Sequence, residues 1–177
     1  MLFVVTPCSR PENLEKIAPT IPDFCQWIVL HEQSLSLPKI QNMTTIVCPK
    51  TGFVGADGRN YFLDNFILND DDWIYSLDDD NIIHPDFYKI EKFLLEDFSL
   101  VHWGQLNKDN TVRLKPLSDI IIDTIDAACF ISQWKYNKNV RYNTDVYNYD
   151  GFYAIDCAKN GPRLKLDMYL SYYNYLR

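Results

Sequence analysis

The sequence has 177 residues, a length that fits one domain with a buried core. Its formal net charge of −7 argues against sequence-independent binding to nucleic acid, which depends on a positive surface. Apolar residues make up 47% of the chain, as in ordinary globular proteins, and aromatic residues make up 15%. Aromatic side chains either fill a core or line a carbohydrate site, where a ring face stacks on the C–H face of a sugar.

Cysteine usage and hydropathy limit the cellular setting. Five cysteines are scattered along the chain, and none forms a C-x-x-C pair, so the pattern favours reduced, buried thiols over disulfides or a zinc site. The chain opens on an apolar strand without a basic region before it, and no apolar run approaches the length of a membrane span. We therefore expect a cytoplasmic protein with no membrane span.

Short apolar runs alternate with helical patterns through the first half of the chain. The expected strands cover residues 2–5, 27–30, 44–48 and 73–77. A helix is expected from Pro11, where the missing N–H costs nothing, and another over 59–68 after the glycine-rich stretch 51–58. The fourth strand runs directly into three consecutive aspartates, Asp78-Asp79-Asp80.

The second half is less regular. Its expected elements are, in chain order, a helix from Pro85 with Phe87, Ile90, Leu94 and Phe98 on one face, a strand over 100–103, a turn around 107–110, a strand over 125–131, a loop over 136–149 and a short helix that follows Asp150 and runs through Ala158.

Strands that alternate with helices indicate an α/β fold with a doubly wound, mostly parallel sheet flanked by helices. In such sheets, ligands bind beyond the carboxyl ends of the strands. The Thr6–Arg10 loop and the Asp78–Asp80 triplet both follow strands at these ends. The sequence therefore predicts a ligand site where the two segments meet.

The triplet carries the strongest chemical signal. Three adjacent carboxylates repel one another, so folding them together is costly unless a cation compensates. Oxygen ligands suit Mg²⁺ and Mn²⁺, and an ion held in this way can bridge a diphosphate. Alternate residues of an extended chain point the same way, so Asp78 and Asp80 are expected on one side and Asp79 on the other. The alternative is a solvated acidic turn.

Four segments resemble motifs of glycosyltransferases with the GT-A fold. Residues 73–81, WIYSLDDDN, look like the strand and DXD segment of that fold, especially in the glucuronyltransferases. Residues 5–11, VTPCSRP, are similar to their nucleotide loop, and residues 55–60, GADGRN, resemble the segment that precedes the DXD strand. Residues 125–130, IDAACF, are like an acceptor-side segment of the same group. Three of these matches occur in family order within residues 1–81.

The resemblance implies a single Rossmann-type GT-A-like domain with a nucleotide-binding half over 1–81 and an acceptor-binding half over 82–177. The chain is short for this fold, which is consistent with one module of a longer polypeptide. The implied activity is metal-dependent transfer of a sugar from a nucleotide-sugar donor to a glycan or another hydroxyl acceptor. Mn²⁺ or Mg²⁺ is the expected metal, and UDP is the favoured carrier because it is the commonest in the resembling families.

The resemblance also assigns roles in the nucleotide half. Thr6, Pro7 and Arg10 would border the base and the ribose. Glu32 would accept a hydrogen bond from the base, with an ordinary loop acid as the alternative. Arg59 would reach the diphosphate or the neighbouring carboxylates, unless it forms only a salt bridge at the start of its helix.

Within the triplet, Asp80 would coordinate the metal directly and Asp78 would contact the ribose or sugar and share the metal. Asp79 is assigned to either donor or metal. Many members of the family have a further histidine ligand near the end, but residues 166–177 contain none, so that ligand is replaced or absent. The three histidines, His31, His84 and His102, are isolated and are expected to be structural.

An inverting transferase also needs a base to take the proton of the acceptor hydroxyl. Residues 149–152, YDGF, and the helix after them look like the acid-containing element of family-2-like transferases, which makes Asp150 the candidate base. Its alternative role is an N-cap for that helix. Asp145 and Asp126 are the reserve candidates, and a retaining mechanism becomes more plausible if no base stands there.

Other functions compete with this interpretation. A sugar-phosphate nucleotidyltransferase usually has a long glycine-rich, basic loop after the first strand, whereas the Thr6–Pro11 loop has one arginine and no glycine. A non-catalytic nucleotide-sugar-binding module would bind the donor without turnover. A hydrolase with clustered carboxylates would need further acids for a second metal, and none is assigned.

Overall fold

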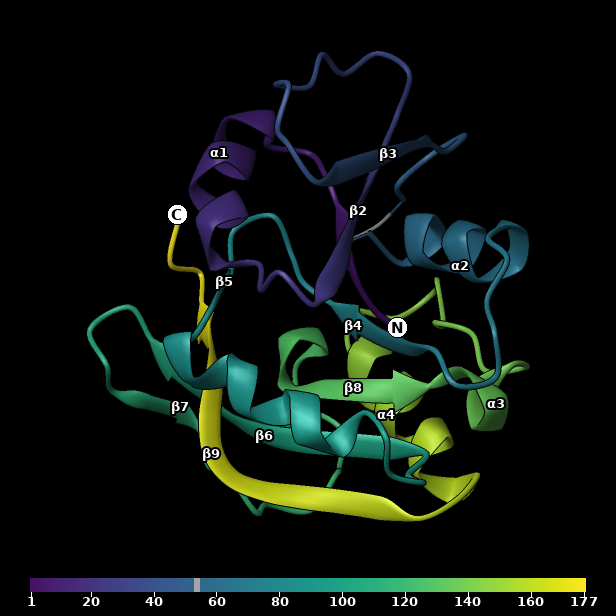
Figure 1. The fold of residues 1–177 in the computed structure, drawn as a ribbon, viewed down its shortest axis with the longest axis vertical. Coiled ribbons are helices and arrows are strands. Elements are labelled where there is room, and N and C mark those ends of the chain that lie inside the picture. Colours follow the sequence, from purple (N-terminus) through teal and green to yellow (C-terminus); the bar gives the residue numbers. More distant parts are fainter. Residues whose placement is uncertain (53–54) are drawn as a thin grey trace.

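Four parallel strands form the N-terminal part of the sheet, in the order β3-β2-β1-β4 (Figure 1). They are β1 (Leu2–Pro7), β2 (Cys25–His31), β3 (Met43–Val47) and β4 (Trp73–Ser76). β1 and β4 are buried along their whole length, which explains why they read as continuous apolar runs in the sequence. The computed structural model describes residues 1–52 and 55–177, so part of the expected glycine-rich stretch 51–58 lies outside the described residues.

The sheet continues through strands of the C-terminal half. β8 (Phe130–Gln133) runs antiparallel to β4 and to β6 (Leu100–Asn107), whereas β9 (Arg163–Tyr173) runs parallel to β6. Two short strands, β5 (Ile82–Ile83) and β7 (Val112–Leu114), pair antiparallel with β9 and β6. The sheet is mixed but mostly parallel, which confirms the predicted α/β fold class.

Helices cover both faces of this sheet (Figure 1). Buried residues of α2 (Ala56–Asn65) and α4 (Tyr149–Lys159) pack in one core with Phe3 and Val5 of β1. The opposite core contains Leu2 and Val4 together with residues of α1 (Leu14–Ile17), η2 (Ala18–Thr20) and η4 (Pro85–Phe93). A short 3-10 turn, η1 (Pro11–Asn13), precedes α1. Alternate residues of β1 thus face opposite cores, as a doubly wound sheet requires.

Several elements differ from the sequence prediction. The helix expected over 59–68 begins earlier, at Ala56, because its N-cap is Gly55, which adopts the left-handed region with φ 86°. The helix from Pro85 is a 3-10 helix, in which the three-residue spacing of Phe87 and Ile90 places both side chains on the buried side. No element was expected over the stretch after Leu166, which forms most of β9.

The strand predicted over 125–131 is wrong in its first half. The side chain of Asp126 accepts a hydrogen bond from the N–H of Ala128 at 3.0 Å and caps a turn of 3-10 helix, η5 (Ala127–Cys129). The strand therefore begins only at Phe130. A further short helix, α3 (Trp134–Asn137), interrupts the start of the expected loop 136–149.

The five cysteines are free, and four of them are buried, as the sequence predicts. Among residues 1–52 and 55–177, no helix is both long and apolar enough to cross a membrane.

Candidate functional site

A pocket of about 300 Å³ opens beyond the carboxyl ends of β1 and β4. Its walls come from the 7–10 loop, the Asp78–Asp80 triplet, the start of α4 and the segment after β9. The first two segments are those that the sequence predicts to meet at this edge of the sheet. The last two come from the C-terminal half of the chain, so both halves build the pocket.

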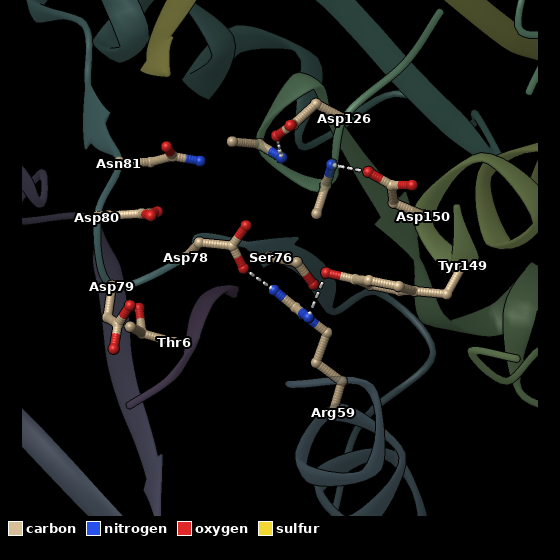
Figure 2. A network of polar contacts seen from close by, with 12 residues as sticks. Thr6, Arg59, Ser76, Asp78, Asp79, Asp80, Asn81, Asp126, Tyr149 and Asp150 are labelled. Carbon is tan, nitrogen blue, oxygen red and sulfur yellow. Dashed lines mark hydrogen bonds and ion pairs between the residues drawn. The ribbon is translucent and has the colours of Figure 1, made fainter. Parts of the chain in front are cut away.

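The triplet splits its side chains as the alternation predicts. Figure 2 shows the carboxylate of Asp79 turned away from those of Asp78 and Asp80. Asp79 is 2% exposed, and its carboxylate binds the 7–10 loop. One of its oxygens accepts the backbone N–H groups of Ser9 and Arg10 at 2.6 and 2.8 Å, and the other accepts Nε of Arg10 at 2.9 Å. The carboxylate of Asp79 is therefore occupied in shaping the loop.

Replacing Asp79 by asparagine should destabilise the fold. The variant puts an amide N–H₂ against groups that donate, and breaking a buried charge pair typically costs about 3 kcal/mol. For a chain of this size we expect the melting temperature to fall by roughly 6–12 °C. Thermal unfolding by circular dichroism measures the change. Asp156→Asn, in an exposed pair with Lys159, is the control and should melt within about 2 °C of wild type; an equal loss in both variants would contradict the anchoring role.

Asp78 faces a buried arginine. Arg59, 1% exposed, forms an ion pair with Asp78 and donates a hydrogen bond to the hydroxyl of Tyr149 at 3.0 Å (Figure 2). Its guanidinium also lies over the rings of Tyr142 and Tyr149. Burial raises the pKa of Asp78 to about 6, against the lowering effect of Arg59. Of the two contacts predicted for Arg59, the structure therefore gives the one with the neighbouring carboxylates.

Asp80 meets two further guanidinium groups. Its Oδ2 lies 3.0 Å from Nη1 of Arg10 and forms a second ion pair with Nε of Arg177. Each carboxylate of the triplet thus has an arginine beside it: Arg59 at Asp78, Arg10 at Asp79 and Arg177 at Asp80. The positive charge that we expected beside the three carboxylates is provided here by arginine side chains.

The triplet can also accept a divalent cation, by its chemistry. Asp80 is 2% exposed, and its Oδ2 accepts no well-aligned hydrogen bond despite the two ion pairs. The described residues contain no group of three or more His, Cys, Asp or Glu side chains that could hold a metal. Mg²⁺, however, usually binds through one or two carboxylates together with substrate phosphates, and keeps several waters. Asp80 and Asp78 fit that incomplete kind of site.

Asp150 lies across the pocket from the triplet (Figure 2). It lies inside the first turn of α4, whose N-cap is Asn148, so the alternative role of Asp150 as an N-cap is wrong. Its carboxylate oxygens accept the N–H groups of Gly151 at 2.8 Å and Ala127 at 3.2 Å. Burial, followed by the negative charge of Asp126, raises the pKa of Asp150 to about 7. A carboxylate with this pKa can hold or release a proton near neutral pH.

The reserve acids are placed differently. Asp126 lines the same pocket, but its carboxylate caps η5 and pairs with Arg113 at 2.9 Å. Asp145 is exposed and is not among the residues that line the pocket. Of the two reserve acids, Asp126 is therefore engaged by an arginine, and Asp145 lies outside the pocket.

Of the remaining residues predicted to bind the nucleotide-sugar, some line the pocket and others lie behind its wall. Pro7 and Arg10 line the pocket, and a side chain at Gly55 would come within 2.7 Å of Pro7, so the backbone passes close only because residue 55 is glycine. Thr6 is buried, and its hydroxyl accepts the indole N–H of Trp27 at 3.0 Å. Glu32 accepts the N–H and hydroxyl of Thr51 at 3.0 and 3.1 Å. Thr6, Glu32 and Arg59 lie behind the residues that form the wall.

Sequence reasoning missed several residues of the pocket wall. Arg113 lies over the ring of Tyr173 at 3.5 Å, and Asn174 and Arg177 follow from the end of β9. No local motif marks these positions. The sequence marks them only by two arginines, Arg113 and Arg177, in a chain with an excess of acidic residues. Their place in the pocket becomes clear only from the pairing of β9 with β6.

Comparisons with known proteins support the fold. No protein-family model matches the chain, and no curated protein matches it. Among solved structures, S. aureus TarS 1–349 is similar with a TM-score of 0.67 and 13% sequence identity, over 97% of this chain and 59% of that one. The same fragment in complex with UDP-GlcNAc gives a TM-score of 0.64 at 12% identity, over 97% and 58%. S. aureus TarS gives 0.57 at 13% identity, over 97% and 36%.

These matches show that the chain has a GT-A-like fold, as the sequence predicts. The chain spans about three fifths of the TarS 1–349 fragment. The UDP-GlcNAc in the second structure is a nucleotide-sugar bound by a protein of this fold.

Proposed function

We propose that the chain is a metal-dependent glycosyltransferase that moves a sugar from a nucleoside diphosphate sugar, with UDP favoured, to a glycan or another hydroxyl acceptor. One observation carries the proposal most directly: on a GT-A-like fold, Asp150 with a pKa of about 7 faces Asp78 and Asp80 across one pocket. A base near neutral pH and an acidic pair for a cation–diphosphate group are the two functions that such a transfer needs.

In this proposal the donor lies between the 7–10 loop and the triplet. Pro7 and Arg10 border the nucleotide, Asp80 and Asp78 hold Mn²⁺ or Mg²⁺, and Asp79 keeps the loop in place. The bound cation supplies positive charge to the leaving nucleoside diphosphate. Thr6, Glu32 and Arg59 support this wall from behind. Arg59 acts by orienting Asp78, because its guanidinium is held by Asp78 and by Tyr149.

Asp150 acts on the acceptor. It takes the proton of the acceptor hydroxyl while that oxygen forms its bond to the anomeric carbon and the bond to the diphosphate breaks on the opposite side, which inverts the configuration. The N–H groups of Ala127 and Gly151 hold the carboxylate and leave lone pairs free for the incoming proton. The free cysteines support our further proposal that the protein works in a reducing, cytoplasmic setting.

The donor class can be tested by calorimetric titration with UDP and GDP, each with Mn²⁺ and with chelator. We expect one nucleotide, UDP by preference, to bind in the presence of Mn²⁺ and to bind at least about tenfold more weakly with chelator. If the nucleotide binds equally tightly with Mn²⁺ and with chelator, donor binding does not depend on a metal. If a folded sample binds neither nucleotide, the chain is not a transferase of this donor class.

A further inference from the structure

The segment after β9 folds back onto the acidic triplet. The backbone N–H of Leu176 donates to the carbonyl of Asp80 at 3.0 Å, and that of Asn174 donates to the side-chain oxygen of Asn81 at 2.8 Å. These two contacts bring the side chain of Arg177 to Asp80, where it forms its ion pair. Backbone hydrogen bonds therefore hold residues 174–177 against residues 80–81, and this position places Arg177 beside the carboxylate of Asp80.

The three arginines at the triplet differ in how firmly they are held. Arg59 is enclosed by Asp78 and two tyrosine rings, and its side chain is 1% exposed. Arg10 binds Asp79 through Nε and a terminal nitrogen, so the same carboxylate holds both its backbone and its side chain. Arg177 is 60% exposed in its side chain and meets Asp80 through Nε. The carboxylate of Asp80 is buried, but Arg177 has the most exposed side chain of the three arginines, so Arg177 is the one that can leave.

The carboxylate that Arg177 covers is the one expected to bind the divalent cation. A cation at Asp80 and the guanidinium of Arg177 compete for Oδ2 of Asp80, a buried oxygen that lacks an aligned hydrogen-bond donor. Nη1 of Arg10 lies 3.0 Å from the same oxygen, so Arg177 is one of two guanidinium groups there. When Arg177 is displaced, its positive charge remains at the rim of the same pocket. A guanidinium binds phosphate oxygens through paired N–H groups, so a diphosphate in the pocket offers it a new partner.

We propose that Arg177 changes partner during donor loading, from Asp80 in the free protein to the diphosphate of the donor. The inference rests on the proposed function and adds a donor-binding residue that it lacks. It has two consequences of opposite sign. In the free protein Arg177 weakens the binding of a divalent cation, and in the loaded protein it strengthens the binding of the nucleoside diphosphate.

The variant Arg177→Gln tests both consequences by calorimetry. Binding of Mn²⁺ alone should become about tenfold tighter, because one of the two guanidinium groups that compete for Oδ2 of Asp80 is gone. Binding of UDP at saturating Mn²⁺ should become about tenfold weaker, because a charged partner of the diphosphate is lost. Uridine, which has no phosphate, should bind both proteins equally. The matched control is Arg163→Gln, an exposed arginine at the other end of β9, which should change neither affinity.

The outcomes separate this inference from the proposed function. If wild type binds UDP with Mn²⁺ but Arg177→Gln binds Mn²⁺ and UDP with unchanged affinities, the partner exchange is wrong and the transferase proposal stands. Two affinities that shift in the same direction also overturn the exchange, because a single competing or a single supporting role would then suffice. If wild type binds no UDP, both proposals fall together.

Discussion

The variant Asp150→Asn should lose sugar transfer by about 10³-fold while its affinity for UDP and Mn²⁺ stays within about twofold of wild type. An amide cannot take the proton of an attacking hydroxyl, but it has nearly the same shape as the carboxylate. The variant should also remain folded, because loss of one acceptor for the N–H groups of Ala127 and Gly151 is offset by removal of a poorly solvated charge. Single-turnover transfer and nucleotide titration measure the two effects separately.

The pH dependence gives this prediction a second readout. Asp150 works as a base only when deprotonated, and its pKa is raised to about 7. Transfer should therefore rise with pH, from roughly one tenth of its maximum at pH 6 to half at pH 7, and level off above pH 8. Asp78, whose pKa burial raises to about 6, must also lose its proton, so transfer should fall more steeply below pH 6. In Asp150→Asn the step near pH 7 should disappear, whereas the dependence on Asp78 should persist.

The matched control for Asp150 is Asp145→Asn. Asp145 is an exposed acid a few residues earlier in the chain, so its replacement changes the same charge without touching the pocket. Its transfer rate and pH profile should follow wild type. Near wild-type transfer by Asp150→Asn would show that Asp150 is not the base, and a retaining mechanism would then gain support.

The nucleotide side of the pocket could be predicted from sequence because its parts are local. The strand before Asp78 and the strand before Thr6 are apolar runs, and parallel strands bring their carboxyl ends to one edge. The alternation of Asp78, Asp79 and Asp80 along an extended chain also gave the correct split of their side chains. The alternation did not predict the partner of Asp79. Its buried carboxylate binds the backbone of the 7–10 loop.

The other side could be predicted only in part, because it depends on contacts between distant segments. Asp150 was found through its resemblance to an acid at a helix start, but its raised pKa arises from burial and from Asp126, which come together only in the fold. Arg177 meets Asp80 because β9 lies between β6 and β5 in the sheet, which places the residues that follow β9 beside the triplet. The repulsion among three adjacent aspartates predicted a compensating cation. It could not show that an arginine lies beside each of the three carboxylates, because these arginines come from distant parts of the chain.

The variant Asp80→Ala should abolish the Mn²⁺-dependent part of UDP binding, a loss of at least about 100-fold, or roughly 2.7 kcal/mol. Asp80 is the carboxylate with an oxygen that accepts no aligned hydrogen bond, so its removal takes away the best available cation ligand of the triplet.

The fold should survive the change from Asp80 to alanine, because Arg10 keeps its bonds to Asp79 and Arg177 is exposed to solvent. Asp71→Ala, at an exposed acid in the loop before β4, serves as the control and should bind UDP and Mn²⁺ like wild type. If Asp80→Ala still binds UDP more tightly with Mn²⁺ than with chelator, then Asp80 does not hold the metal. Asp78 would be the remaining candidate of the triplet, because Asp79 is committed to the 7–10 loop. If instead UDP binds the variant equally well with and without Mn²⁺, at wild-type strength, the arginines at the triplet carry the diphosphate and the transferase works without a metal.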